Sequence, residues 1–127
     1  LPIWRDITLI GIGRMAARAL EAADALAREG VEAEVVDPRT LAPLDMETIC
    51  ESVRRTHRAL VLDAAPKSYG VTAEIAARIS EEAFDWLDAP VARLAAIDAP
   101  VAISRSLEPL IVPDAAAIAA KAKELLR

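Results

Sequence analysis

The chain has 127 residues, which is enough for one domain with a hydrophobic core and too few for two. Its formal net charge is −5 and it has no run of Lys or Arg, so composition argues against a nucleic-acid partner. The sequence has no apolar stretch of about 18 residues, the length needed to span a membrane. It begins with Leu1-Pro2 rather than Met, and we expect a single domain, residues 1–127, excised from a longer subunit.

Short apolar stretches alternate with amphipathic ones along the sequence. We expect four strands, at residues 7–12, 33–37, 59–63 and 91–97. We expect four helices, at residues 15–29, 45–56, 71–87 and from 113 onward. This alternation predicts an α/β fold with three layers, α/β/α, around an open, mainly parallel sheet of four to five strands. We expect the first strand to lie between the second and third, with the fourth outside the third, and right-handed crossovers then put helices on both faces of the sheet.

Each predicted helix has an apolar face that we expect to lie on the sheet. In the first helix these residues are Ala16, Ala19, Leu20, Ala23 and Leu26, and Gly30 suits the left-handed residue that ends it. In the second helix they are Met46, Ile49, Cys50 and Val53, behind an N-cap at Asp45. In the third helix they are Val71, Ile75, Ile79, Ala83 and Trp86 or Leu87, and in the last helix Ile118, Ala122, Leu125 and Leu126.

The first strand-to-helix turn offers a cofactor hypothesis. Residues 11–16 read G-I-G-R-M-A and fit the G-x-G-x-x-G/A pattern of dinucleotide-binding domains. In this alternative, Gly11 and Gly13 let a pyrophosphate approach the helix and Asp37 binds a ribose hydroxyl of NAD(P). The other interpretation is a tight turn with no ligand.

The sequence shows no convincing catalytic set. His57 is the only histidine, and its place in a helix-to-strand turn beside several arginines predicts an ordinary surface residue. Asp63 ends a predicted strand like the phosphoacceptor of a receiver domain, but the acidic pair and lysine of such a site are absent, so we expect Asp63 to cap the following loop. Cys50 is expected to be a small buried hydrophobe, which fits a reducing compartment.

Residues 35–45 read V-V-D-P-R-T-L-A-P-L-D, an apolar strand that runs into a proline-flanked elbow and a helix start. Arg39 and Thr40 lie in this elbow, where we expect them to hydrogen-bond the loop and an adjacent carboxylate. The stretch resembles the D-L-R-T-L-x-P-L-D of transketolase-like C-terminal domains. Five further stretches resemble that family in the same order: G-R-M at 13–15, E-S-V-R-R-T at 51–56, A-E-I-A-A at 73–77, E-A-F at 82–84 and L-D-A-P-V at 87–91.

The chain therefore resembles the transketolase C-terminal domain family, and within it most nearly the beta subunit of thiamine-diphosphate-dependent 2-oxoacid dehydrogenases. The resemblance implies that thiamine diphosphate and Mg²⁺ are bound by other domains of the parent enzyme, that this chain binds no cofactor, and that it is inactive alone. It also implies an additional antiparallel strand, for which residues 1–4 are the available segment. The expected location is the cytoplasm, or the mitochondrial matrix in a eukaryote.

The resemblance further implies a role in assembly and docking. The expected partners are an alpha subunit, a second beta subunit and the subunit-binding domain of a lipoyl acyltransferase. Asp88 and the chain end near Arg127 match family positions used in that docking. The long connection at residues 98–112 is a second interface candidate because it contains Leu107, Leu110 and Ile111. We expect these apolar residues to cause self-association of the excised chain.

Overall fold

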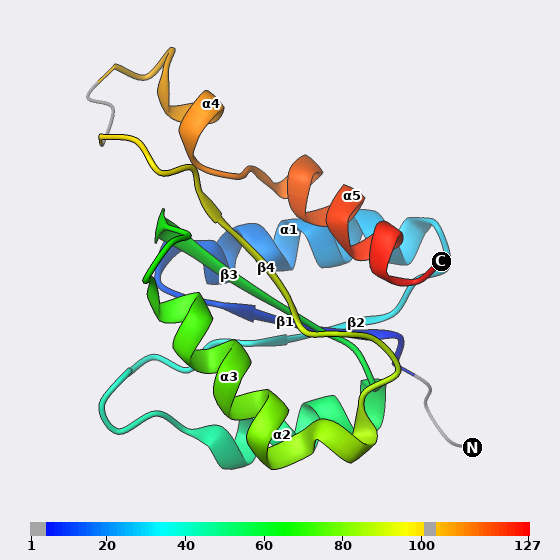
Figure 1. Ribbon diagram of the computed structural model, residues 1–127. Helices are drawn as coiled ribbons and strands as arrows, with labels where there is room; N and C mark the ends of the chain where they lie inside the picture. The colour runs from blue at the N-terminus through cyan, green and yellow to red at the C-terminus, as the bar shows by residue number, and fades with distance from the viewer. Residues whose placement is uncertain (1–4, 101–103) are drawn as a thin grey trace.

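A computed structural model describes residues 5–100 and 104–127, and its sheet confirms the predicted fold class (Figure 1). Four parallel strands are hydrogen-bonded in the order β2-β1-β3-β4, as predicted. They are β1 (Ile7–Gly11), β2 (Ala33–Val36), β3 (Ala59–Pro66) and β4 (Ala92–Ala96). The additional antiparallel strand expected at residues 1–4 lies outside the described residues.

Helices cover both faces of the sheet, which gives the three predicted layers (Figure 1). One face carries α1 (Arg14–Arg28) and α5 (Ala115–Leu125), and the other carries α2 (Met46–Thr56) and α3 (Val71–Ala83). Two short elements complete the fold, the 3₁₀-helix η1 (Phe84–Trp86) and α4 (Glu108–Ile111). The elbow at residues 37–45 and α4 both lie beyond the carboxyl ends of the strands, which we call the carboxyl edge of the sheet.

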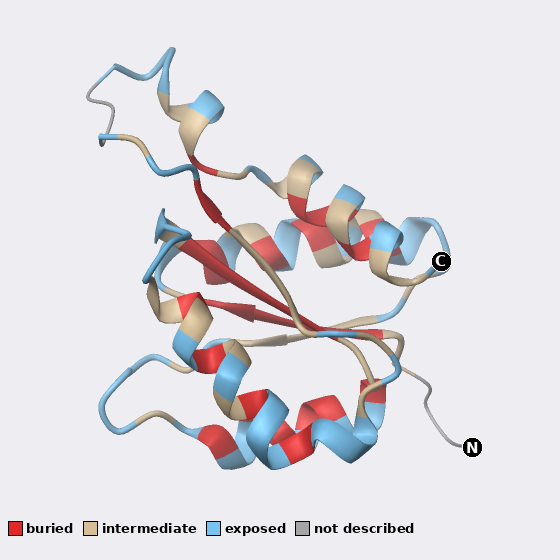
Figure 2. Cartoon of the chain, viewed as in Figure 1, coloured by how far each residue is buried: buried red, intermediate tan, exposed pale blue. Residues whose placement is uncertain are grey.

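The sheet separates two apolar cores, and Figure 2 shows buried residues, in red, on the strands and on the helices of both faces. On one face Leu9 and Leu62 pack with Leu26 of α1 and Ile118 of α5. On the other face Ile10 and Val61 pack with residues of α2 and α3 that include Ile49, Val53, Ile75 and Ile79. Alternate residues of a strand point to opposite faces, so the continuous apolar runs of β1 and β3 supply both cores.

One local expectation about the apolar faces is wrong. Leu20 is 57% exposed, because the buried stripe of α1 follows Met15, Ala19, Ala22 and Leu26 and Leu20 lies about 100° around the helix from Ala19. Of the other predicted inward residues, Leu125 packs against the core while partly buried, and Ala23 and Leu126 are also partly buried. The sequence pattern thus identified the correct side of α1 but not the edge of its buried face.

The predicted helix 71–87 is too long. The α-helical hydrogen bonds end at Ala83, and the chain tightens into η1, where the Leu87 amide donates to the Phe84 carbonyl at 3.1 Å. His57 holds this turn, since its Nδ1 lies 2.6 Å from the Trp86 carbonyl and its own carbonyl accepts from the Asp88 amide at 2.8 Å. Contacts from a segment distant in sequence therefore end the helix.

Several predicted local features are confirmed. Asp45 caps α2, because its Oδ1 accepts a hydrogen bond from the Thr48 amide at 3.1 Å. Gly30 follows α1 with a φ of 81°, a left-handed conformation that glycine adopts without strain. Cys50 is buried on the α2 side of the sheet, where burial raises the pKa of its thiol.

Candidate functional site

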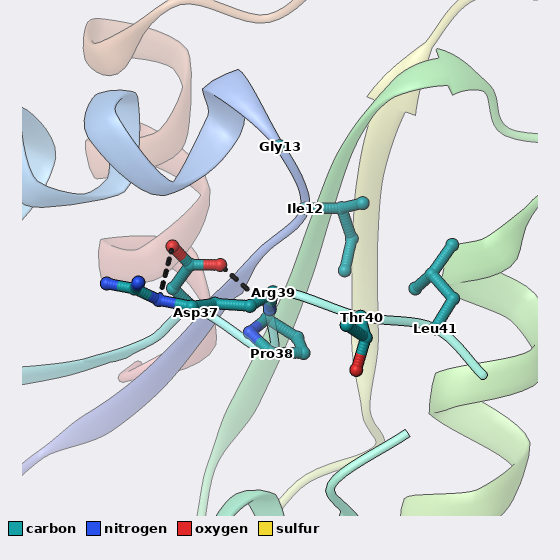
Figure 3. A pocket seen from close by; sticks show the side chains of 7 residues that line it. All are labelled: Ile12, Gly13, Asp37, Pro38, Arg39, Thr40 and Leu41. Carbon is teal, nitrogen blue, oxygen red and sulfur yellow. Dashed lines mark hydrogen bonds and ion pairs between the residues drawn. The ribbon is translucent and has the colours of Figure 1, made fainter. Parts of the chain in front are cut away.

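The elbow forms a pocket at the carboxyl edge with a volume of about 300 Å³, shown in Figure 3. Its lining comes from the turn after β1 and from the residues after β2, and consists of Ile12, Gly13, Asp37, Pro38, Arg39, Thr40 and Leu41. The predicted loop contacts are present: the Arg39 amide donates to Asp37 Oδ1 at 3.0 Å and the Thr40 hydroxyl donates to the Pro43 carbonyl at 2.8 Å. Asp37 is therefore occupied in holding the elbow.

The two glycines of the dinucleotide pattern have separate local roles. A Cβ on Gly11 would lie 2.7 Å from the backbone nitrogen of Ala16, so glycine is needed for α1 to pack against the end of β1. Gly13 has a φ of 58°, and a Cβ there would meet no atom within 4 Å. A close helix approach at Gly11 and a positive φ at Gly13 thus explain the pattern without a ligand.

A second concave surface runs along the outside of α3, with a volume of about 530 Å³. We call it the α3 groove, and its lining residues are Ala76, Ala77, Ser80, Phe84, Leu87, Asp88, Ala89, Pro90 and Val91. Small side chains on α3 form one wall, and the turn into β4 forms the other. Phe84 is 70% exposed beside it, which is unusual for so large an apolar side chain in a monomer.

Three of the six stretches that carry the family resemblance contribute residues to the α3 groove. The A-E-I-A-A segment supplies Ala76 and Ala77, and E-A-F supplies Phe84. All five residues of L-D-A-P-V, from Leu87 to Val91, line the opposite wall. Most of these side chains lie outside the two cores, so the structure gives them a surface position that core packing does not require.

The predicted interface residues lie at opposite ends of the sheet (Figure 1). Asp88 precedes β4 and is therefore at the amino edge, on the α2/α3 side. α5 runs back along the sheet, so Arg127 also lies at the amino edge, in the other helical layer. Leu107 and Leu110 lie at the carboxyl edge and are 51% and 71% exposed, whereas Ile111 packs partly against the core.

Other candidate residues have mainly structural roles. Asp63 lies inside β3 rather than at its end, because the strand continues to Pro66, and its Oδ1 accepts from the Ala64 amide at 2.8 Å. His57 is half-buried and stacks against Trp86, with ring centroids 6.4 Å apart. Among residues 5–100 and 104–127, no group of three or more His, Cys, Asp or Glu is placed to hold a metal ion.

Sequence reasoning missed a polar network between α2 and the sheet. The buried Thr8 hydroxyl lies 2.7 Å from both the Ser52 and the Thr56 hydroxyl. Ser52 also donates to Glu34 Oε1 at 2.7 Å, and Arg55 makes two hydrogen bonds to the same carboxylate. The hydrogen bonds from Arg55 are the main reason that the pKa of Glu34 is lowered. A signal was present, since three of these residues belong to E-S-V-R-R-T.

The sequence profile of the family described as "Transketolase, C-terminal domain" matches residues 4–118. The chain belongs to the transketolase C-terminal domain family. A relative in this family is the acetoin:2,6-dichlorophenolindophenol oxidoreductase subunit beta of Cupriavidus necator, which is 43% identical over 97% of this chain. Another is the mitochondrial pyruvate dehydrogenase E1 component subunit beta-2 of Oryza sativa subsp. japonica, which is 40% identical over 94% of the chain.

A solved structure of the same fold is a split-gene transketolase, described as an inactive beta4 tetramer. It superposes with a TM-score of 0.82 and 30% identity over 98% of this chain, and this chain covers 39% of it. Our chain likewise spans about a third of the two relatives, 36% of the first and 32% of the second. The family match confirms the recognition made from sequence and does not support the dinucleotide-binding alternative.

Among the described helices, none has both the length and the apolar character needed to cross a bilayer.

Proposed function

We propose that this chain is the non-catalytic C-terminal assembly and docking domain of the beta subunit of a thiamine-diphosphate-dependent 2-oxoacid dehydrogenase. The observation that supports the proposal is the α3 groove, because three neighbouring stretches of the family resemblance, within residues 73–91, line it at a surface position. The relatives named as pyruvate dehydrogenase and acetoin oxidoreductase beta subunits support the choice of parent enzyme.

In this proposal the domain is part of a longer subunit whose other domains bind thiamine diphosphate and Mg²⁺. The parent reaction is the oxidative decarboxylation of a 2-oxoacid. The partners are an alpha subunit, a second beta subunit and the subunit-binding domain of a lipoyl acyltransferase. We propose a cytoplasmic location in a bacterium and the mitochondrial matrix in a eukaryote, where the rice relative is named as mitochondrial.

The chemistry of the α3 groove suits a partner that presents an apolar side chain next to a cation. Ala76, Ala77 and Pro90 offer apolar surface, and Asp88 places a carboxylate at the edge of that surface. Asp88 is exposed, so a partner Arg or Lys would pair with it at the rim of the interface. Such rim charges contribute mainly to specificity and to the rate of association, while the apolar contacts supply most of the affinity.

The backbone of the docking turn is already fixed. His57 makes two hydrogen bonds with this turn. Its Nδ1 bonds with the Trp86 carbonyl, and its own carbonyl accepts from the Asp88 amide, so the residues on either side of Leu87 are held. A partner that binds there does not have to order this backbone, which lowers the entropic cost of binding. Arg127 lies at the same edge, and its chain end offers a second charged group to a partner that reaches over both layers.

The surface around α4 is the proposed contact for subunit association. Leu107, Leu110 and Ile97 are all exposed at the carboxyl edge, away from Asp88. Separate surfaces for assembly and docking allow both to be occupied in the same complex.

Isothermal titration of the purified chain with the subunit-binding domain of a lipoyl acyltransferase tests the docking proposal. We expect saturable binding that Asp88→Ala weakens by about tenfold, since loss of a charge-assisted contact costs about 1–2 kcal/mol. Asp85→Ala is the matched control, because Asp85 is an exposed acid on the adjacent turn that does not line the groove. Equal weakening by both variants would reduce the effect to general charge and remove Asp88 from the site.

A parallel titration with NADH tests the alternative. Micromolar NADH binding that Gly13→Val abolishes would replace the docking proposal with a dinucleotide site, whereas absence of any heat change with NADH is the result that we expect.

A further inference from the structure

Two arginines on the first turns of α1 converge on a single carboxylate at the carboxyl edge. Arg14 Nη1 lies 2.6 Å from Glu108 Oε1, and Arg18 Nη2 lies 3.7 Å from the same oxygen. Arg18 is also fixed by a 2.8 Å hydrogen bond from its Nη1 to the Pro113 carbonyl. Both guanidinium groups are thus held in place around the position that one carboxylate oxygen occupies.

A small cavity lies next to this ion pair. Its volume is about 70 Å³, and apart from Arg14 and Glu108 it is lined by apolar residues, namely Ala64, Pro66, Ala96, Ala99, Ile111 and Val112. The carboxyl ends of β3 and β4, the loop after β4 and the segment that contains α4 form its walls. One water molecule takes up about 30 Å³ of liquid, and a methylene group is of similar size, so the cavity has room for a chain of about two carbon atoms.

The charges at this place are not balanced within the described residues. Arg14 and Arg18 make their ion pairs there with Glu108 alone, which leaves one positive charge in excess although the whole chain is acidic. Glu108 belongs to α4, an element of only four residues, and its side chain is 36% exposed. The Glu108 side chain can therefore rotate into water at little cost, because an exposed ion pair contributes only about 0–1 kcal/mol.

We propose that Arg14, Arg18 and the adjacent cavity form a binding site for a short aliphatic monocarboxylate. Without the ligand, the Glu108 carboxylate occupies the position that the ligand carboxylate would take. The ligand carboxylate takes the position of Glu108 between the two guanidinium groups, and its carbon chain enters the cavity lined by Ala64, Ala96 and Ile111. The site is separate from the docking surface at the other edge of the sheet, and it adjoins the α4 surface proposed for subunit association, so the ligand would bind at the rim of that contact.

Titration of the ¹⁵N-labelled 127-residue chain with sodium propionate, followed by ¹H–¹⁵N NMR, tests this site. We expect saturable shifts of the Arg14, Ala96, Ala99 and Glu108 amides with a dissociation constant of about 1 mM to 10 mM, as suits a ligand of so few atoms. Propionamide has the same size without the charge, and it should produce no saturable shift at these amides. Equal binding of propionamide would overturn the proposal, since the guanidinium groups would then play no part.

Variants separate a ligand site from an ordinary ion pair. Glu108→Gln removes the internal competitor and should lower the propionate dissociation constant at least about threefold. Arg14→Met and Arg18→Met should each raise it about threefold to fivefold, whereas Arg28→Met, at the far end of the same helix, should leave it unchanged. If Glu108→Gln fails to strengthen binding, or if Arg28→Met weakens it as much as Arg14→Met, then Glu108 does not compete with a ligand and the proposal is wrong.

Discussion

Gly11 and Gly13 are required for different physical reasons, although they belong to one sequence pattern. Gly11 lies in β1 where the backbone of Ala16 approaches within 2.7 Å of the position that a Cβ would take. Gly13 is limited by its backbone angle and has free space around it. The two positions should therefore tolerate different substitutions.

Substitution by alanine and by asparagine separates these two roles. Gly13→Ala and Gly13→Asn should destabilise the fold by a similar amount, about 1–3 kcal/mol, because φ 58° with ψ −128° strains any residue that has a Cβ, whereas the free space there makes side-chain size unimportant. Gly11→Ala should cost about 1–3 kcal/mol and Gly11→Asn more, since the Cβ already overlaps the α1 backbone and a larger side chain adds to the overlap. Urea unfolding of the four variants measures the free energies of unfolding. A cost that rises from alanine to asparagine at Gly13 as well as at Gly11 would contradict the assigned difference.

The network at Glu34 should make stability depend on pH. Arg55, through its hydrogen bonds, holds the pKa of Glu34 below the ordinary value of 4.5, while partial burial opposes this effect. The unfolded chain then binds a proton at higher pH than the folded chain does. Ionised Glu34 therefore stabilises the fold above pH 4.5, and this contribution is lost as the pH falls through the lower folded value.

Glu34→Gln tests this contribution. The wild type should lose more free energy of unfolding than Glu34→Gln when the pH is lowered from about 6 to about 3, because the variant has no carboxylate to protonate there. Glu32→Gln is the control, since Glu32 is exposed on the adjacent loop and pairs with Arg5. Parallel pH profiles of the wild type and Glu34→Gln would show that the network does not couple to protonation.

At the scale of elements, two helices depend on aspartate caps. Asp45 accepts from the Thr48 amide at the start of α2, and Asp114 Oδ1 accepts from the Ala117 amide at 2.8 Å at the start of α5. Hydrogen bonds from the Thr48 hydroxyl and amide lower the pKa of Asp45, so its cap is kept well below neutral pH. Both caps satisfy backbone donors that the helix itself cannot pair.

Asp45→Ala and Asp114→Ala should each cost about 0.5–2 kcal/mol in the free energy of unfolding. Asp45→Asn should recover much of the loss, because asparagine also accepts a hydrogen bond at this position. Thermal and urea unfolding measure these changes. A loss of stability in Asp45→Asn as large as in Asp45→Ala would mean that the negative charge, and not the cap hydrogen bond, stabilises α2.

Sequence reasoning worked where a feature depends on local pattern. The strand order, the two helical layers, the cap at Asp45 and the left-handed Gly30 followed from periodicity and from the conformational preferences of single residues. It failed where contacts with segments distant in sequence determine where a helix ends or which residues are buried. The helix predicted to reach Leu87 ends at Ala83, where His57 holds the following turn, and Leu20 is exposed because the width of the buried face depends on neighbouring elements.

The same limit applies to the candidate surfaces. Residues of the L-D-A-P-V segment could be singled out by resemblance, and the structure adds that they face Ala76 and Ala77 across one groove. The convergence of Arg14 and Arg18 on Glu108 could not be predicted, because these residues are about 90 positions apart. No periodicity relates side chains at such a separation.

At the scale of the whole molecule, apolar side chains at the carboxyl edge should cause self-association. Leu107 and Leu110 are exposed, and Leu110 and Ile97 line a pocket of about 200 Å³ together with Leu94 and Ala95 of β4. We expect sedimentation velocity to show a concentration-dependent oligomer that Leu110→Ser weakens, since each buried leucine contributes about 1.5–3 kcal/mol. Leu20→Ser is the control, because Leu20 is comparably exposed on α1. A monomer at all concentrations that binds no hydrophobic dye would contradict the expectation.

Asp88 lies before β4 and Leu110 belongs to the segment that follows it, and they line different pockets, the α3 groove and the pocket beside α4. Two partners that bind at these places share no side chain, so neither has to leave before the other arrives. The two partners can then bind in either order. A substitution at one edge of the sheet alters the lifetime of the contact at that edge without altering the other contact. Kinetic measurements on a ternary complex would accordingly give two separate dissociation rates, each equal to that of the binary complex.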